Sequence, residues 1–144
     1  MKSCGRLATR VDQEWLERVQ GVQIASSLTP DNALTLKDGA TLARELGGRY
    51  LIRYLHSDQL GTGQQGSVAP CYVTPTAYSP EDCVRWLALP NPAHPREFAL
   101  ILDPSKIPAA LGPRWVRLGD GIEYLLPQGF PPEALVLPWE VRIS

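Results

Sequence analysis

The sequence has few cysteines and histidines, and this scarcity argues against several kinds of site. Its three cysteines, Cys4, Cys71 and Cys83, cannot all pair and have no Cys-x-x-Cys spacing. Neither a disulfide framework nor a zinc site is indicated, and a reducing compartment fits best. The two histidines, His56 and His94, lie far apart with no companion at metal-ligand spacing. We therefore expect no metal cofactor.

Long apolar runs and targeting patterns are also lacking. No segment approaches the roughly 20 apolar residues of a membrane helix, and the basic residues between Met1 and Val11 are not followed by an apolar stretch. We expect no membrane partner, no signal peptide and a location in the cytoplasm, either of the producing cell or of a target cell after delivery. With 14 basic and 15 acidic residues, the net charge of −1 argues against binding to duplex DNA.

Common catalytic and nucleotide-binding motifs are missing as well. There is no Gly-x-Ser-x-Gly motif and no Walker-type loop. Gly61-x-Gly63-x-x-Gly66 has the letters of the dinucleotide-binding fingerprint, but Pro70 and a predicted strand follow it where a helix should begin. We interpret this segment as a loop.

Proline is scarce in the first half, because 13 of the 14 prolines lie at or after Pro70. Proline breaks helix interiors, so helices are expected early and strands late. The patterns predict helices over residues 12–19 and 38–46, both before the first strand, and one short helix that begins after Ser79 and ends before Pro90. The chain is long enough to fold as a single domain, 1–144, with a helical part (1–48) and a β-rich core (49–144).

Strand patterns fill the rest of the chain and give an α+β fold. In the first strand, alternation places Leu51, Arg53 and Leu55 on one face and Ile52, Tyr54 and His56 on the other. The predicted strands are 49–56, 71–74, 97–102, 115–118, 122–126, 135–137 and 139–143.

Two charged residues interrupt apolar strands. Arg53 is costly among apolar neighbours unless it is paired, so it forms either a structural ion pair or a fork for a diphosphate or carboxylate ligand. Glu123 enters an apolar strand from a Gly-rich turn. It is either a half-exposed edge residue or an acid directed into a cleft, with Tyr124 facing the other side.

The remaining polar and aromatic candidates have plain structural explanations when they are taken alone. Thr74, Thr76, Tyr78 and Ser79 are typical of turns and helix N-caps. The large apolar side chains Trp86, Leu87 and Trp115 are expected in the core.

Three segments, taken in order, resemble the NAD⁺-cleaving toxin domains of bacteria. They are Arg53 to Ser57, Tyr72 to Tyr78 with Arg85 to Pro90, and Gly112-Pro113 with Gly119 to Tyr124. The related families are the ADP-ribosyltransferase fold and the necrotizing-toxin type NAD glycohydrolases. The resemblance covers roughly residues 36 to 126 and implies an ADP-ribosyltransferase-like split sheet that follows the N-terminal helices and carries one short helix.

The resemblance also implies roles for single residues, with NAD⁺ as substrate. Glu123 would stabilise the ribosyl cation, and Arg53 would hold the pyrophosphate. Tyr72 or Tyr78 would stack on the nicotinamide, with Thr74 and Ser79 as hydrogen-bonding supports. His56 is a second candidate for the first-strand role. It lies on the opposite face from Arg53, so one of the two should line the cleft.

Two departures from the families bear on the reaction. Transferases that modify arginine carry a second Glu two residues before the catalytic one, where this chain has Gly121, and the glycohydrolase toxins tend to have Gln at the position of Glu123. The leading hypothesis is a toxin or effector domain that transfers ADP-ribose to a protein or RNA acceptor, with a cognate immunity protein as partner. The alternatives are an NAD⁺ glycohydrolase and, from another class, a non-enzymatic adaptor or immunity-type binding module in which Arg53 and Glu123 pair.

Overall fold

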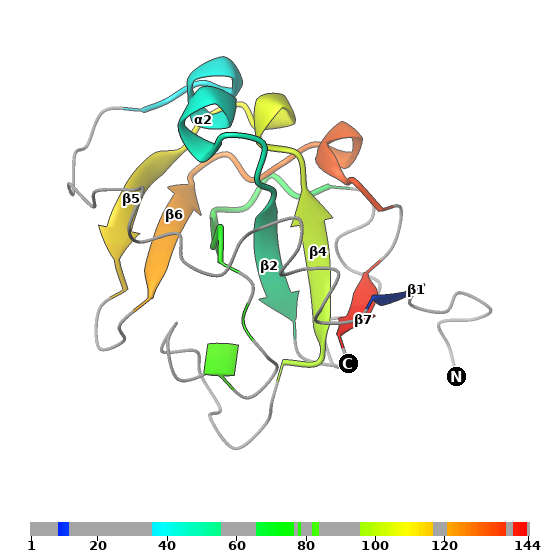
Figure 1. Cartoon of the computed structure of the whole chain (residues 1–144). Coiled ribbons are helices and arrows are strands. Elements are labelled where there is room, and N and C mark those ends of the chain that lie inside the picture. Colours follow the sequence, from blue (N-terminus) through cyan, green and yellow to red (C-terminus); the bar gives the residue numbers. More distant parts are fainter. Residues whose placement is uncertain are drawn as a thin grey trace.

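The chain forms a small α+β protein in which a helix packs against two β-sheets (Figure 1). The structure, a computed structural model, describes residues 9–11, 36–55, 66–76, 78, 82–83, 96–116, 121–137 and 140–143. The predicted α+β class is confirmed. The elements are β1 (Thr9–Val11), α2 (Gly39–Leu46), β2 (Leu51–Leu55), β3 (Cys71–Val73), β4 (Phe98–Leu102), β5 (Leu111–Trp115), β6 (Ile122–Leu126) and β7 (Val141–Ile143), with short 3₁₀ helices at Pro104–Lys106 and Pro132–Ala134.

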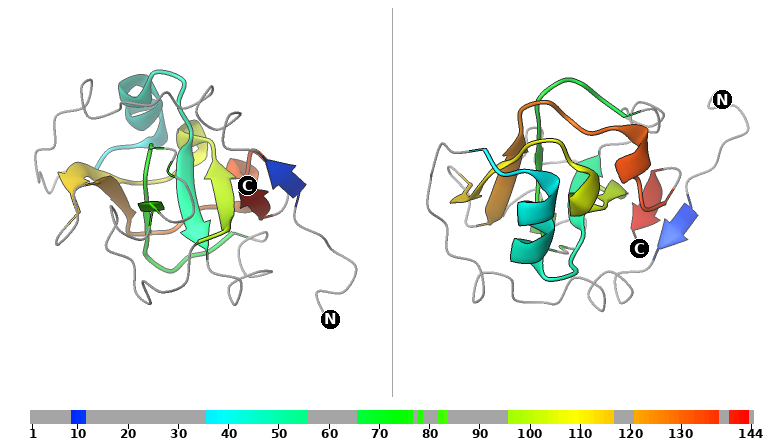
Figure 2. Two further views of the ribbon diagram at one scale, coloured as in Figure 1. Left: turned by 60° about the horizontal axis from the view of Figure 1, so that its bottom comes forward. Right: turned by 90° about the horizontal axis from the view of Figure 1, so that it is seen from above.

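Two sheets form the body of the molecule. One has the strand order β1-β7-β4-β2 and the other the order β3-β6-β5. The pairings are antiparallel, apart from the parallel pairing of β1 with β7. Figure 1 and Figure 2 show β5 and β6 at one side of the molecule and β7 with β1 at the opposite side. Strands β2 and β3, each at the end of its own sheet, therefore face each other in the middle.

Helix α2 begins and ends where the sequence predicts, because both of its caps are encoded locally. The Asp38 side chain accepts a hydrogen bond from the Thr41 backbone N–H at 2.9 Å, which satisfies one of the free donors at the helix start. At the other end, Gly47 adopts a left-handed conformation with φ of 59°, and its N–H bonds back to the carbonyls of the last turn. The predicted helix over 38–46 is confirmed.

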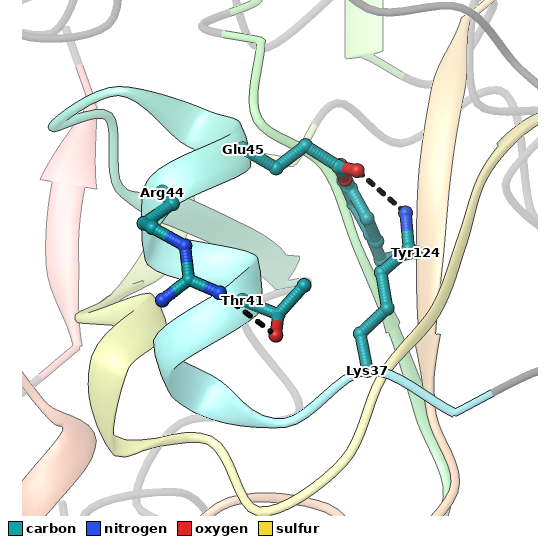
Figure 3. Close-up of polar contacts among 5 residues, drawn as sticks. All are labelled: Lys37, Thr41, Arg44, Glu45 and Tyr124. Carbon is teal, nitrogen blue, oxygen red and sulfur yellow. Dashed lines mark hydrogen bonds and ion pairs between the residues drawn. The ribbon is translucent and has the colours of Figure 1, made fainter.

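A polar cluster attaches α2 to strand β6 (Figure 3). Glu45 on the helix pairs with Lys37 at 2.6 Å and accepts a hydrogen bond from the hydroxyl of Tyr124. The Lys37 ammonium lies 6.0 Å from the centre of the Tyr124 ring. Because Tyr124 is fully buried and its hydroxyl is bonded, this cluster orients β6 relative to the helix.

The two faces of β2 contribute to two different groups of core side chains. Leu51 and Leu55 pack with residues of α2, β4 and β6, whereas Ile52 and Tyr54 pack on the other side with residues of β4 and β7. The alternation predicted for residues 51–55 is confirmed. Arg53 shares the face of Leu51 and Leu55, and its position in the strand is opposite Leu100 of β4.

The predicted order of elements is wrong at the N-terminal end. Strand β1 precedes α2, where the sequence predicts two helices before any strand. β1 has three residues and depends on pairing with β7, so no local pattern marks it. The helix predicted over 12–19 lies outside the described residues, as do Trp86 and Leu87. Of the short helix predicted after Ser79, residues 82 and 83 are described, and both are helical.

Two strand predictions near the C-terminal half also need correction. Strand β5 begins at Leu111, four residues before the predicted start, and runs through Gly112-Pro113. Proline is tolerated there because β5 ends its sheet and pairs with β6 in an irregular register. Trp115, predicted to be core, is 54% exposed at the end of this outer strand. The predicted strand over 135–137 is reduced to one bridge between Leu135 and Leu102.

Candidate functional site

Within the described part of the chain, one backbone bridge joins the two sheets, between β2 and the residue after β3. Ile52 and Thr74 exchange both of their backbone hydrogen bonds, at 2.8 and 2.9 Å. If the antiparallel ladder continued, Tyr54 and Tyr72 would be the next two residues to exchange backbone hydrogen bonds. The bridge is isolated, so the two strands diverge beyond it.

Arg53 lies at the point of divergence. Its Nη1 donates a hydrogen bond of 3.3 Å to the Tyr72 carbonyl oxygen, the acceptor that the interrupted ladder leaves available. The nearby Arg53 charge also partly opposes the burial that raises the pKa of the Cys71 thiol. Within the described residues no carboxylate pairs with Arg53. The guanidinium is half-buried and keeps donors for an anionic ligand.

Glu123 lies on the central strand β6, and its ion-pair partner is Arg114 of β5. The distance from Arg114 Nε to Glu123 Oε2 is 3.1 Å. Tyr124 faces the core on the opposite side of the strand, as predicted. The pair of Arg53 with Glu123 that the adaptor hypothesis requires is not among the ion pairs of the described part of the chain, because Glu123 pairs with Arg114 instead.

A β-bulge places Arg114 opposite Glu123. The register between β5 and β6 shifts between Leu111 and Arg114, so β5 carries one extra residue. Continued from Leu111, which pairs with Leu125, the register would set Pro113 opposite Glu123. The bulge forms at Gly112, whose φ of 134° suits glycine. It therefore directs a guanidinium onto the carboxylate.

Tyr72 connects the two arginines. Its carbonyl accepts from Arg53, while its hydroxyl accepts a 3.3 Å hydrogen bond from Arg114 Nη2. The Arg114 guanidinium also lies 5.4 Å from the centre of the Tyr72 ring, within cation–π range. The ring is 49% exposed. Tyr72, Arg114 and Glu123 thus form one polar surface on the outer face of the β3-β6-β5 sheet. Arg53 contacts Tyr72 at its backbone carbonyl, from the face of β2 that carries Leu51 and Leu55.

The electrostatics of Glu123 reflect two opposing effects. Burial disfavours the charged carboxylate and raises its pKa above the ordinary glutamate value. The hydrogen bond and the positive charge of Arg114 act in the other direction, and burial prevails. A second cation near Glu123 would therefore stabilise the charged form of its carboxylate further.

Thr74, predicted to support a ligand, has its hydroxyl engaged by the backbone. Thr74 Oγ1 donates to the Ile122 carbonyl at 2.9 Å and accepts from the Thr76 N–H at 3.2 Å. The residue is 1% exposed. It fastens the junction of the two sheets to β6.

Replacing Thr74 with Val should lower the free energy of unfolding by about 2 kcal/mol, because the buried Ile122 carbonyl and Thr76 N–H lose their side-chain partner. Thr74→Ser keeps the hydroxyl and should cost about 1 kcal/mol, for one lost methyl group. Urea denaturation of both variants measures the difference. Equal losses would show that the hydroxyl has no structural role.

Tyr78 lies on the other side of β2 from Arg53. Its backbone N–H donates to the Tyr54 hydroxyl at 2.5 Å, and its carbonyl accepts from that hydroxyl at 3.0 Å. The two rings are 6.4 Å apart, and burial raises the pKa of both phenols. Tyr78 thus packs beside Tyr54 of β2, whereas Tyr72, the other candidate for stacking, contacts Arg114 of β5. The candidates His56 and Ser79 lie outside the described residues.

Arg114 is the residue that sequence reasoning missed. Arg114 precedes Trp115, which pairs with Ile122, and it therefore lies opposite Glu123. Gly112-Pro113, directly before Arg114, is not typical of a strand, so the sequence does not predict this pairing.

The described residues contain no group of three or more His, Cys, Asp or Glu side chains that could hold a metal ion. Cys71 and Cys83 are buried. The described helices include none that is long and apolar enough to cross a membrane. Comparison with protein-family models gave no matching family, and neither a curated protein nor a solved structure matched the chain.

Proposed function

We propose that this chain is an NAD⁺-cleaving toxin or effector domain that transfers ADP-ribose to a protein or RNA acceptor. The observation that carries the proposal is the divergence of β2 from β3 after one bridge, with Arg53 and Tyr72 on the two sides. On this proposal the two sheets are the halves of an ADP-ribosyltransferase-like split sheet, and the dinucleotide binds where they separate.

The chemistry requires a cationic ribose to be stabilised. The bond between ribose C1′ and the nicotinamide nitrogen breaks, and its electron pair leaves with the nitrogen and neutralises the pyridinium ring. The positive charge on C1′ is then quenched by an acceptor oxygen or nitrogen, which releases its proton to solvent. A carboxylate beside C1′ lowers the energy of the oxocarbenium-like transition state, as in glycoside hydrolysis.

The described side chains supply groups for this reaction. Glu123 is the carboxylate for the ribosyl cation, and burial strengthens its attraction to a cation. Arg53, with no carboxylate partner in the described residues, binds the pyrophosphate through its planar fork. The exposed ring of Tyr72 offers a stacking surface for the nicotinamide. The supporting roles of His56, Tyr78 and Ser79 stay predictions.

A single assay tests the proposal and separates it from its alternatives. Purified protein is incubated with NAD⁺ labelled on the adenylate phosphate, with and without cell lysate, and nicotinamide release is measured in parallel. A labelled protein or RNA band supports transfer, whereas rapid nicotinamide release without lysate supports a glycohydrolase that depletes NAD⁺. If neither binding nor turnover of NAD⁺ occurs, the binding-module hypothesis is preferred and no catalytic role remains for Glu123.

Arg53→Gln should lower kcat/KM for NAD⁺ at least about tenfold, because a charge-assisted contact to the pyrophosphate is lost. Arg44→Gln is the matched control. It removes the same charge from an exposed position on α2, where Arg44 contacts Thr41 (Figure 3). Thermal unfolding of both variants verifies that they fold. Wild-type turnover by Arg53→Gln would exclude Arg53 from the site.

A further inference from the structure

We propose that Arg114 is a second phosphate-binding residue. When the dinucleotide binds, the Arg114 side chain gives up its ion pair with Glu123 and binds the pyrophosphate of the substrate instead. This inference rests on the proposed function and deepens it. The Glu123 carboxylate is proposed to stabilise the ribosyl cation, but it is already paired with the Arg114 guanidinium. For Glu123 to act on the ribose, the Arg114 charge must be neutralised or moved.

The contacts of Arg114 suit such a change of partner. The guanidinium gives one nitrogen, Nε, to Glu123 and another, Nη2, to the Tyr72 hydroxyl, so it does not bind the carboxylate with its two-pronged fork. Within the described residues Nη1 has no partner. The Arg114 side chain is 30% exposed and that of Glu123 is 14% exposed. The cation is thus the member of the pair that a ligand can reach more easily.

The charges of the ligand complement those of the site. The pyrophosphate of NAD⁺ carries two negative charges, and the nicotinamide riboside end carries one positive charge. Arg53 and Arg114 match the two phosphates, and Glu123 matches the cationic end. For Arg114 and Glu123, their one ion pair within the protein is replaced by two between protein and ligand. Because partly exposed ion pairs are weak, the pair of Arg114 with Glu123 opposes this exchange only slightly.

The β-bulge indicates that Arg114 is positioned by the fold. A regular ladder would place Pro113 opposite Glu123, and proline has no group for a phosphate or a carboxylate. The extra residue at Gly112 breaks the ladder between Leu111 and Arg114 and brings a guanidinium to that place. Tyr72 then holds the guanidinium over its ring, while its backbone carbonyl accepts the hydrogen bond from Arg53.

ADP tests the inference without any turnover, because it carries a pyrophosphate and lacks the nicotinamide riboside. Carboxyl ¹³C NMR of the full chain gives the pKa of Glu123 with and without saturating ADP, with Glu123→Gln used to assign the resonance. Wild type should show a rise in this pKa on ADP binding. Arg114→Gln should start from a higher pKa and show a smaller rise, which reports the direct effect of the ADP charges alone. Arg44→Gln should behave as wild type.

ADP affinity provides a second readout. Calorimetry should show ADP binding at least about tenfold weaker in Arg114→Gln than in wild type, since one charge-assisted contact is gone. If ADP binds but raises the Glu123 pKa equally in wild type and Arg114→Gln, the exchange is wrong, while the proposed function stands. If wild type neither binds ADP nor cleaves NAD⁺, both proposals are wrong.

Discussion

Glu123→Gln is expected to reduce nicotinamide release from NAD⁺ at least about 100-fold, the scale of removing one preorganised electrostatic group from an active site. Glutamine has nearly the same shape and can still accept a hydrogen bond from Arg114, but it provides no charge for the ribosyl cation. The assay is release of nicotinamide by purified protein. Glu133→Gln is the matched control, because Glu133 is exposed in the 3₁₀ helix at Pro132–Ala134.

The same variant should not be destabilised at neutral pH. The folded state raises the pKa of Glu123, so the contribution of this residue to stability is greatest below the ordinary glutamate pKa and is lost as the pH rises through its folded-state pKa. Glutamine cannot ionise, and this loss should disappear. Denaturation at pH 4 and pH 7 should therefore show a smaller pH dependence in Glu123→Gln than in wild type. An unfolded or strongly destabilised variant would indicate a structural carboxylate.

Gly112→Ala is expected to lower the free energy of unfolding by about 3 kcal/mol and to remove most of the activity. A Cβ atom there would lie 2.9 Å from the Glu123 carbonyl oxygen and 3.0 Å from the Tyr124 ring, and the φ of 134° is one that alanine rarely adopts. Relief of the clash would move β5 away from β6. Arg114 and Glu123, which depend on that pairing, would separate.

Gly47→Ala is the control for a glycine with positive φ. At φ of 59° the added Cβ meets nothing within 4 Å, so the cost should be that of the left-handed conformation alone, about 1 kcal/mol, with activity retained. Urea denaturation and nicotinamide release measure both variants. Equal effects of the two substitutions would show that the bulge at Gly112 has no special importance.

The parts of the fold that the sequence predicts are those with local causes. Asp38 and Gly47 cap α2 within one turn of the helix, and alternation along 51–55 and 122–126 identifies the buried faces of β2 and β6. Strand β1 and the path of β5 through Gly112-Pro113 were not predicted, because each depends on a partner strand.

The same distinction, between local causes and dependence on a partner strand, applies to the residues of the candidate site. Arg53 and Glu123 could be selected because a charge inside an apolar strand is conspicuous in the sequence. Their partners could not be selected in this way. Arg53 bonds to a backbone carbonyl that is available only because β2 and β3 diverge, and Arg114 reaches Glu123 only through a one-residue shift in register.

The parallel pairing of β1 with β7 has a consequence for the synthesis of the protein. Thr9 pairs with Val141, so the first described strand waits for a partner near the other end of a 144-residue chain. During translation β1 emerges well before β7 and has no strand to join until β7 has been made. The β1-β7-β4-β2 sheet is therefore completed only after β7 is synthesised, and contacts between residues so distant in sequence slow folding.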